Sequence, residues 1–169
     1  HFLLNQLFLH QIIGMIYPIV AYGASVLRKV ASPIQPDYPK LDALIESMWE
    51  TMYASNGVGL AAPQVNLSIR FFVIDSVQIM EHLEEDEKDA YPGDEGMKEV
   101  FINAEVLQLE GEEWPYNEGC LSIPKIREDV YRPEKVTLRY FDANFQEHTK
   151  TFTGITARVI LHEYDHIEG

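Results

Sequence analysis

The sequence predicts a single domain that combines helices with strands, and three observations lead to this expectation. Apolar residues at helical spacing mark residues 41–53, and a second helix is predicted over residues 155–167. Alternating or β-branched apolar residues mark four strands, at residues 68–77, 100–109, 136–142 and 146–152. A chain of 169 residues, 46% of them apolar, is long enough for one domain with a sizeable core.

Composition and charge exclude two classes of partner. The formal net charge is −14, and half of it comes from residues 81–99, which hold nine acidic side chains against two lysines. This balance repels phosphate backbones and anionic lipid, so we expect no direct binding to DNA or to a membrane. Residues 81–99 are expected to form a solvated loop, with a partner-binding tail as the less favoured alternative. The single cysteine, Cys120, excludes an internal disulfide and fits a reducing compartment, here the cytoplasm.

The first fourteen residues contain no Asp, Glu, Lys or Arg, and they lack the basic start of a secretory signal. We expect residues 1–14 to be a segment added for expression, or a disordered one, ahead of a natural start at Met15. A degenerate targeting segment is the alternative. No run reaches the ~18 apolar residues that a membrane-spanning helix needs. The catalytic domain is therefore expected over residues 15–169.

The elements follow in order from Met15. A short helical piece is predicted at residues 25–31, and three prolines then make residues 33–39 stiff and extended. The helix at 41–53 should pack its apolar stripe into the core and end at Asn56-Gly57.

A run of small residues, 57–64, follows this helix and ends in an amide side chain, Gln64. A phosphate-binding loop is excluded, because no Lys-Ser/Thr follows and the run leaves a helix instead of opening one. Two alternatives remain, a tight turn with packed alanines or the wall of a peptide groove.

The strands at 68–77 and 100–109 come next, and Gly111 is expected to turn the second of them. The strands at 136–142 and 146–152 form a hairpin, and Gly154 separates this hairpin from the closing helix.

The closing helix carries the strongest chemical signal. His162 and His166 are four residues apart, so they stand on one face where two imidazoles bind one metal ion, and Glu163 lies beside them. In metal-dependent hydrolases with this pattern the glutamate handles the proton of a water activated by the metal. The alternative is an exposed helical turn with two solvated histidines.

A third ligand is needed, and Cys120 in the segment Glu118-Gly119-Cys120-Leu121-Ser122 is a candidate. A lone cysteine is most often a buried apolar residue, but here a glycine and an acidic residue flank it. His82 and His148 compete with it as ligands, although the first falls in the acidic segment and the second in the predicted hairpin.

Together, the segments 57–64, 118–122 and 162–166 resemble the three motifs of the peptide deformylase family, in the same order. The resemblance covers the chain from Met15 to its end. It implies an α+β fold in which antiparallel strands pack around a central metal-binding helix. It also implies that the C-terminal end of the family domain is missing from this chain.

The resemblance implies roles for individual residues. Cys120, His162 and His166 would hold the metal, Glu163 would act as general base, and the Gln64 amide and the Leu121 backbone N–H would hold the developing oxyanion. The backbones of Val58, Gly59 and Gly119 would pair with an extended substrate. Two structural contacts are also expected, an ion pair between Glu118 and Arg132 behind the cysteine loop, and an Asp165 hydrogen bond behind the metal ligands. The pocket for the methionine side chain would be lined by four apolar residues, Val58, Leu121, Ile155 and Val159.

The cofactor and partners follow from the same resemblance. One divalent ion is expected, ferrous iron natively, with zinc, nickel or cobalt as occupants after purification. The substrates would be formyl-methionyl peptides of nascent chains, from which formate is released. Docking on the ribosome would depend on the missing C-terminal part.

Two other functions are alternatives to this one. A zinc-type metallopeptidase is disfavoured, because its third ligand normally lies downstream of the second histidine and only three residues follow His166. A catalytically silent metal-binding domain is disfavoured, because Glu163 and Gln64 are both present.

Overall fold

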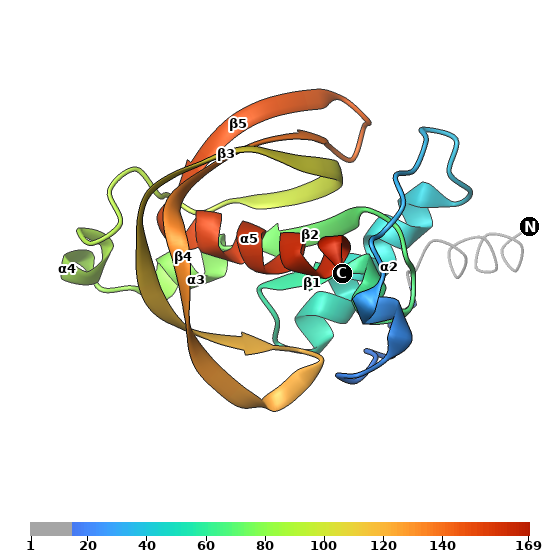
Figure 1. The fold of residues 1–169 in the computed structure, drawn as a ribbon, viewed down its shortest axis with the longest axis horizontal. Coiled ribbons are helices and arrows are strands. Elements are labelled where there is room, and N and C mark those ends of the chain that lie inside the picture. The colour runs from blue at the N-terminus through green and yellow to red at the C-terminus, as the bar shows by residue number, and fades with distance from the viewer. Residues whose placement is uncertain (1–14) are drawn as a thin grey trace, which may run out of the picture.

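The computed structural model describes residues 15–169, and its main feature is one antiparallel sheet curved around a helix (Figure 1). The five strands lie in the sheet in chain order, and they are β1 (Gly59–Ala61), β2 (Phe71–Asp75), β3 (Lys98–Cys120), β4 (Ile123–Phe141) and β5 (Glu147–Thr153). The helical segments are η1 (Ser25–Arg28), α2 (Leu41–Ala54), η2 (Ala62–Val65), α3 (Val77–His82), α4 (Glu85–Lys88) and α5 (Gly154–Glu168). The predicted α+β fold, with antiparallel strands around a central helix, is confirmed.

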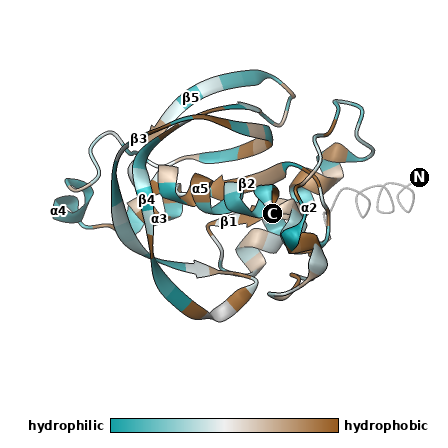
Figure 2. Ribbon diagram, viewed as in Figure 1, coloured by the Kyte–Doolittle hydropathy of each residue, from teal (hydrophilic) through white to brown (hydrophobic). Residues whose placement is uncertain are grey.

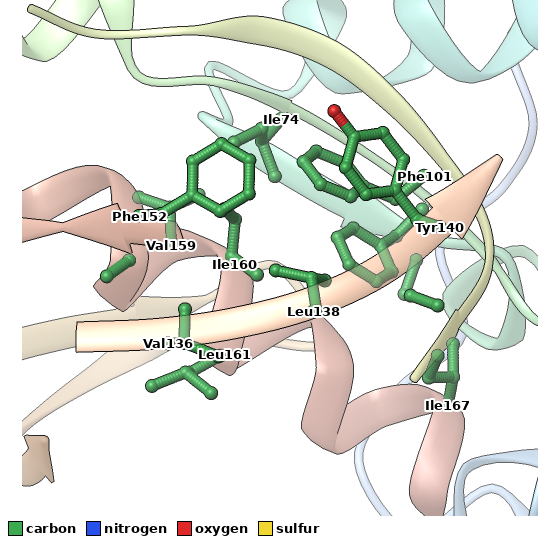
Figure 3. Packing of buried hydrophobic residues seen from close by; sticks show 14 of the residues in the cluster. Ile74, Phe101, Val136, Leu138, Tyr140, Phe152, Val159, Ile160, Leu161 and Ile167 are labelled. Carbon is green, nitrogen blue, oxygen red and sulfur yellow. The ribbon is translucent and has the colours of Figure 1, made fainter. Parts of the chain in front are cut away.

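Helix α5 crosses the middle of the molecule, enclosed by the curved strands β3, β4 and β5 (Figure 1). Seven consecutive residues, 155–161, are buried, so this part of the helix is covered on every side. Figure 3 shows Val136 and Leu138 of β4 in the same cluster as Ile160 of α5. The helix predicted over 155–167 is confirmed, and its burial fixes the position of the two histidines near its C-terminal end.

Strand β2 separates two halves of the core. Phe72 and Ile74 lie in the cluster around α5, whereas Phe71 and Val73 lie in the cluster around α2, as expected for residues that alternate across a sheet. The apolar stripe predicted on residues 41–53 belongs to this second cluster except for Tyr53, which is 38% exposed, so the stripe is core packing as predicted.

The long hairpin of β3 and β4 corrects two expectations. The strands at 100–109 and 136–142 were predicted, but each is only part of a longer strand. Gly111 does not turn the chain. It has φ +82° at an irregularity in the pairing, and β3 continues beyond it to Cys120. Most of residues 110–119 are exposed or half-buried, so they lack the apolar alternation that marks a strand in the sequence. This extension carries the cysteine to the tip of the hairpin.

The acidic segment 81–99 is not simply a solvated loop, as was expected. It contains part of α3 and the exposed helix α4, which is strongly hydrophilic in Figure 2. Asp94 then returns to the molecule, where its carboxylate accepts hydrogen bonds from the Thr156 backbone N–H (2.9 Å) and hydroxyl (2.6 Å). The N-cap residue of α5, Thr153, makes no capping bond with its own side chain in the described part of the chain, so Asp94 supplies the cap.

Replacing Asp94 with alanine should lower the free energy of unfolding by about 1–2 kcal/mol, because the first turn of α5 loses its acceptor. Urea unfolding of the metal-free protein measures this effect. Asp94→Asn keeps an acceptor oxygen and should lose less. Glu95→Ala is the matched control, since Glu95 is exposed, and an equal loss in that variant would contradict the assignment.

The remaining differences are small. The helix predicted at 25–31 is the short 3-10 turn η1, and the strand predicted at 68–77 is limited to Phe71–Asp75. Within residues 57–64, Gly59–Ala61 form β1 and the last three residues belong to η2. The expectation for residues 1–14 falls outside the described residues. Of the helices within 15–169, none combines the length and the apolar character that crossing a bilayer requires.

Candidate metal centre

The tip of the β3–β4 hairpin meets the last turns of α5, and this brings three metal-binding side chains together. The Cys120 sulfur and one ring nitrogen each of His162 and His166 all lie within 4.8 Å of one another. Sγ of Cys120 is 3.5 Å from Nε2 of His166. These are the three ligands that the sequence predicts. Within residues 15–169, neither His82 nor His148 joins a cluster of this kind, and His148 pairs instead with Asp142.

The pKa values of the triad are shifted because the three groups interact strongly. Burial alone would raise the pKa of Cys120, but hydrogen bonds with His162 and His166 outweigh it and lower the pKa to about 5. Burial would lower the pKa of His162, whereas its hydrogen bonds with Cys120 and Glu118 raise the pKa to about 10. In the metal-free site Cys120 therefore favours the thiolate form, and the protons stay on the neighbouring histidines.

These donors fit one divalent ion. In a tetrahedral site with one sulfur and two nitrogen ligands the donor atoms are ~3.5 Å apart, which agrees with the separation of Cys120 Sγ and His166 Nε2. The sulfur is already favoured as a thiolate, the form that binds metal. Three protein ligands leave one position for a water or substrate, as in catalytic sites.

Glu118 orients His162 from behind. Its Oε1 lies 2.9 Å from Nδ1 of His162, so Nε2 is the nitrogen that faces the other ligands. Arg132 donates to both oxygens of Glu118, at 3.0 to 3.2 Å, and its Nη1 donates to Asp165 at 2.7 Å. The predicted pairing of Glu118 with Arg132 and the predicted place of Asp165 behind the ligands are both confirmed by these contacts.

Glu163 lies in the site and is not one of the three ligands. It is only 4% exposed, and its Oε2 makes no hydrogen bond within the described residues. Burial raises the pKa of this carboxyl group. Gly59 comes so close that an added Cβ would lie 2.7 Å from the other oxygen, Oε1. A buried carboxylate with an unpaired oxygen is suited to exchange protons with a molecule bound in the site.

Gln64 is held in η2 beside the cysteine loop. Its side chain is 1% exposed, and its Oε1 accepts a hydrogen bond from the Ala61 N–H at 3.0 Å. This bond fixes the amide so that Nε2 points toward Cys120 Sγ at 3.6 Å and Ser122 Oγ at 3.4 Å. The amide thus presents an N–H donor beside the metal ligands.

A cavity of about 420 Å³ opens beside the triad. Its walls come from the end of α2, from β1, from the tip of β3 and from the buried face of α5. The lining includes all five residues predicted to bind substrate, Val58, Gly59, Gly119, Ile155 and Val159, together with Cys120, Leu121, His162 and Glu163. A larger cavity of about 900 Å³ lies between residues 90–97 and strands β3 to β5, and its lining includes none of the predicted site residues.

Two arginines in the cavity wall were missed from the sequence. Arg127 follows the cysteine motif, and its side chain donates to Asn117 at the hairpin tip. Arg158 lies one turn before His162 on α5 and is 2% exposed. One signal in the sequence could have identified Arg158. It is a charged residue in a run of apolar helical residues, and it lies four positions before a ligand.

Comparisons with known proteins agree with this geometry. The profile of the family described as Polypeptide deformylase matches residues 16–169. The peptide deformylase of Christiangramia forsetii is 53% identical over 157 residues, which cover 92% of this chain and 79% of that protein.

Solved structures also match. The class I type b peptide deformylase of Acinetobacter baumannii, bound to K3U, has a TM-score of 0.78 at 31% identity, with 92% of this chain and 95% of that chain covered. The same enzyme bound to Met-ala-ser gives a TM-score of 0.77 at 29% identity, with coverages of 92% and 94%.

Proposed function

The chain belongs to the polypeptide deformylase family, and on this premise we propose how its side chains carry out the family reaction. The protein is a hydrolase that removes the formyl group from the N-terminus of nascent peptides, so its substrates are formyl-methionyl peptides. Cys120, His162 and His166 form its metal-binding triad. The assignments below, from the roles of the individual side chains to the identity of the metal, are our proposal.

A divalent ion held by these three residues supplies a Lewis acid and lowers the pKa of a water molecule bound to it. We propose ferrous iron as the native ion, with zinc, nickel or cobalt as occupants after purification. The donor set of one thiolate and two imidazoles accepts all four ions, so the preference for iron comes from the family resemblance alone. Metal analysis of protein purified without oxygen tests it.

Glu163 acts as the proton carrier. Its carboxylate takes a proton from the attacking water, and the resulting hydroxyl adds to the carbon of the formyl group. When the bond between this carbon and the peptide nitrogen breaks, Glu163 returns the proton to the nitrogen, and the formic acid that forms is released as formate after losing its own proton. The buried position of Glu163 supports this role, because its raised pKa brings proton acceptance and proton return closer in energy.

Gln64 and Leu121 hold the oxygen on which negative charge develops. The Gln64 amide is fixed by the Ala61 N–H before any substrate arrives, so its donor requires no reorganisation during the reaction. The backbone N–H of Leu121, next to Cys120, is the second donor. Each such donor commonly lowers the barrier by about 3 kcal/mol.

The peptide lies along β1 in an extended form. Strand β1 is the first strand of the sheet, with β2 on one side only, so its outer edge is placed to receive an added strand. Val58, Gly59 and Gly119 supply the backbone contacts. The methionine side chain enters the cavity between Val58, Leu121, Ile155 and Val159.

The observation that carries this assignment is the buried, non-ligand Glu163 beside a three-ligand metal site. Formate release from formyl-Met-Ala, measured beside casein hydrolysis with anaerobically prepared protein, tests it. Formate without casein cleavage is expected. Casein cleavage without formate would instead indicate a metallopeptidase, and neither activity in metal-replete protein would indicate a silent metal-binding domain.

Gly59→Ala should lower kcat at least tenfold without loss of metal, because the added Cβ would lie 2.7 to 3.0 Å from three atoms of the Glu163 side chain. The buried carboxylate has little room to move aside. Steady-state formate release and metal content measure the two effects.

Gly119→Ala is the matched control for this variant. Its Cβ would meet the guanidinium of Arg127, the far end of an exposed and flexible side chain, and no atom of Glu163. Because Gly119 is assigned a substrate contact, this variant should raise KM, with a much smaller effect on kcat. Equal losses in the two variants would show that crowding of Glu163 is not the cause.

We infer a cytoplasmic protein from its family, since nascent formylated peptides are made there. Docking on the ribosome stays a prediction, which co-sedimentation of this chain with ribosomes would test.

A further inference from the structure

We propose that Arg158 is a positioning residue for the metal centre, acting through Glu118 on His162. The inference rests on the proposed role of His162 as a ligand. Arg158 is neither a ligand nor part of the chemistry assigned above, yet it is almost completely buried in the wall of the substrate cavity.

The contacts of Arg158 tie three elements together. Its Nη1 donates to Glu118 Oε2 and to the Val130 carbonyl of β4, both at 2.7 Å, and its Nη2 donates to the Trp114 carbonyl of β3. The guanidinium carbon also lies 4.2 Å from the centre of the Trp114 ring. A side chain held by three acceptors and an aromatic face has essentially one orientation.

This orientation decides how Glu118 is used. Arg158 occupies Oε2 of the carboxylate, and His162, one helical turn later, bonds to Oε1 at 2.9 Å. Because Arg158 and His162 lie on the same face of α5, the helix presents both donors to one carboxylate at a fixed spacing. Together with Arg132, which bonds both oxygens from β4, these two donors fix the plane of the Glu118 carboxylate and, through it, the orientation of the His162 ring.

The charges around Glu118 support this view. Two carboxylates, Glu118 and Asp165, and two guanidiniums, Arg132 and Arg158, form one connected network whose formal charges cancel. Within this network the Nδ1 side of His162 faces Glu118, so that Nε2 is turned toward the other metal ligands. Without Arg158, Arg132 on the hairpin would be the only guanidinium bonded to the carboxylate.

Cobalt binding tests the proposal directly. Metal-free wild type, Arg158→Leu and Arg158→Lys are titrated with Co²⁺ alone, following the visible d–d absorption, and affinity is measured by competition with a chelator. Arg158→Leu is expected to bind Co²⁺ about 10- to 100-fold more weakly and with a shifted spectrum. Arg158→Lys can still reach Glu118 but not both strand carbonyls, so it should restore the spectrum while stability stays lowered.

A purely structural role would give a different pattern. Arg70→Leu is the matched control, because Arg70 is also held at α5, by the Ile167 carbonyl and Glu168, but makes no contact with Glu118. It should lower the melting temperature and leave the Co²⁺ spectrum unchanged. The proposal is overturned if Arg158→Leu also keeps the wild-type affinity and spectrum. If Arg158→Leu does not fold, the affinity of folded Arg158→Lys for Co²⁺ is the test. A tenfold weaker affinity than that of the wild type overturns the proposal, and an affinity equal to that of the wild type supports it. Formate release by the wild type tests the proposed function separately.

Discussion

Glu163→Gln is expected to lower kcat for formate release by about 10²- to 10⁴-fold, the usual contribution of a general acid–base group. Glutamine has nearly the same size as glutamate, so the buried position is not left empty, but its amide accepts no proton from water. Metal content per chain should stay at the wild-type level, because the three ligand atoms come from Cys120, His162 and His166.

Kinetics and metal analysis of the same preparation check both parts of this result. Glu168→Gln is a suitable control, since Glu168 lies at the end of the same helix, has a side chain that is 44% exposed and pairs with Arg70. Its kcat should be unchanged. An empty metal site in Glu163→Gln would contradict the assignment, because it would make Glu163 a ligand.

The sequence predicts the parts of this fold whose signals are local. The helices 41–53 and 155–167 have apolar residues at helical spacing, and both are found within one or two residues of the expected ends. The distal halves of β3 and β4 were missed, because most of their residues are exposed or half-buried and do not show the alternation of apolar residues that marks a strand. What holds them as strands is their pairing with each other, which no single segment reveals.

The site shows the same division. The spacing of His162 and His166 indicates a metal by itself, but Cys120 could be chosen over His82 and His148 only through the resemblance to a known family. The pairing of Cys120 with the helix depends on a hairpin whose length the sequence does not predict. Arg158 was missed for a related reason, since a charge on a helix normally faces solvent and its burial here depends on Glu118, forty residues away.

Glu118→Gln should destabilise the metal-free protein by about 3–5 kcal/mol, the range for breaking a buried ion pair on one side. The side chain of Glu118 is 8% exposed and that of Arg158 is 3% exposed. Removing the charge of Glu118 therefore leaves a buried guanidinium without its carboxylate. Glu105→Gln is the matched control on the same strand. Its partner is Arg139 and both are about half exposed, so a loss below about 1 kcal/mol is expected. Urea unfolding measures both.

The wild type and Glu118→Gln also differ in how their stability depends on pH. Burial would raise the pKa of Glu118, but hydrogen bonds from His162, Arg132 and Arg158 lower it to about 2, below the ~4.3 of an unfolded chain. A carboxyl group with a lowered pKa stabilises the fold above its unfolded pKa, and this contribution disappears as the pH falls toward 2. The difference in unfolding free energy between the wild type and Glu118→Gln should therefore be full at pH 6 and clearly smaller at pH 3. A difference that stays constant between these two values would show that the charge of Glu118 is not what holds the two arginines.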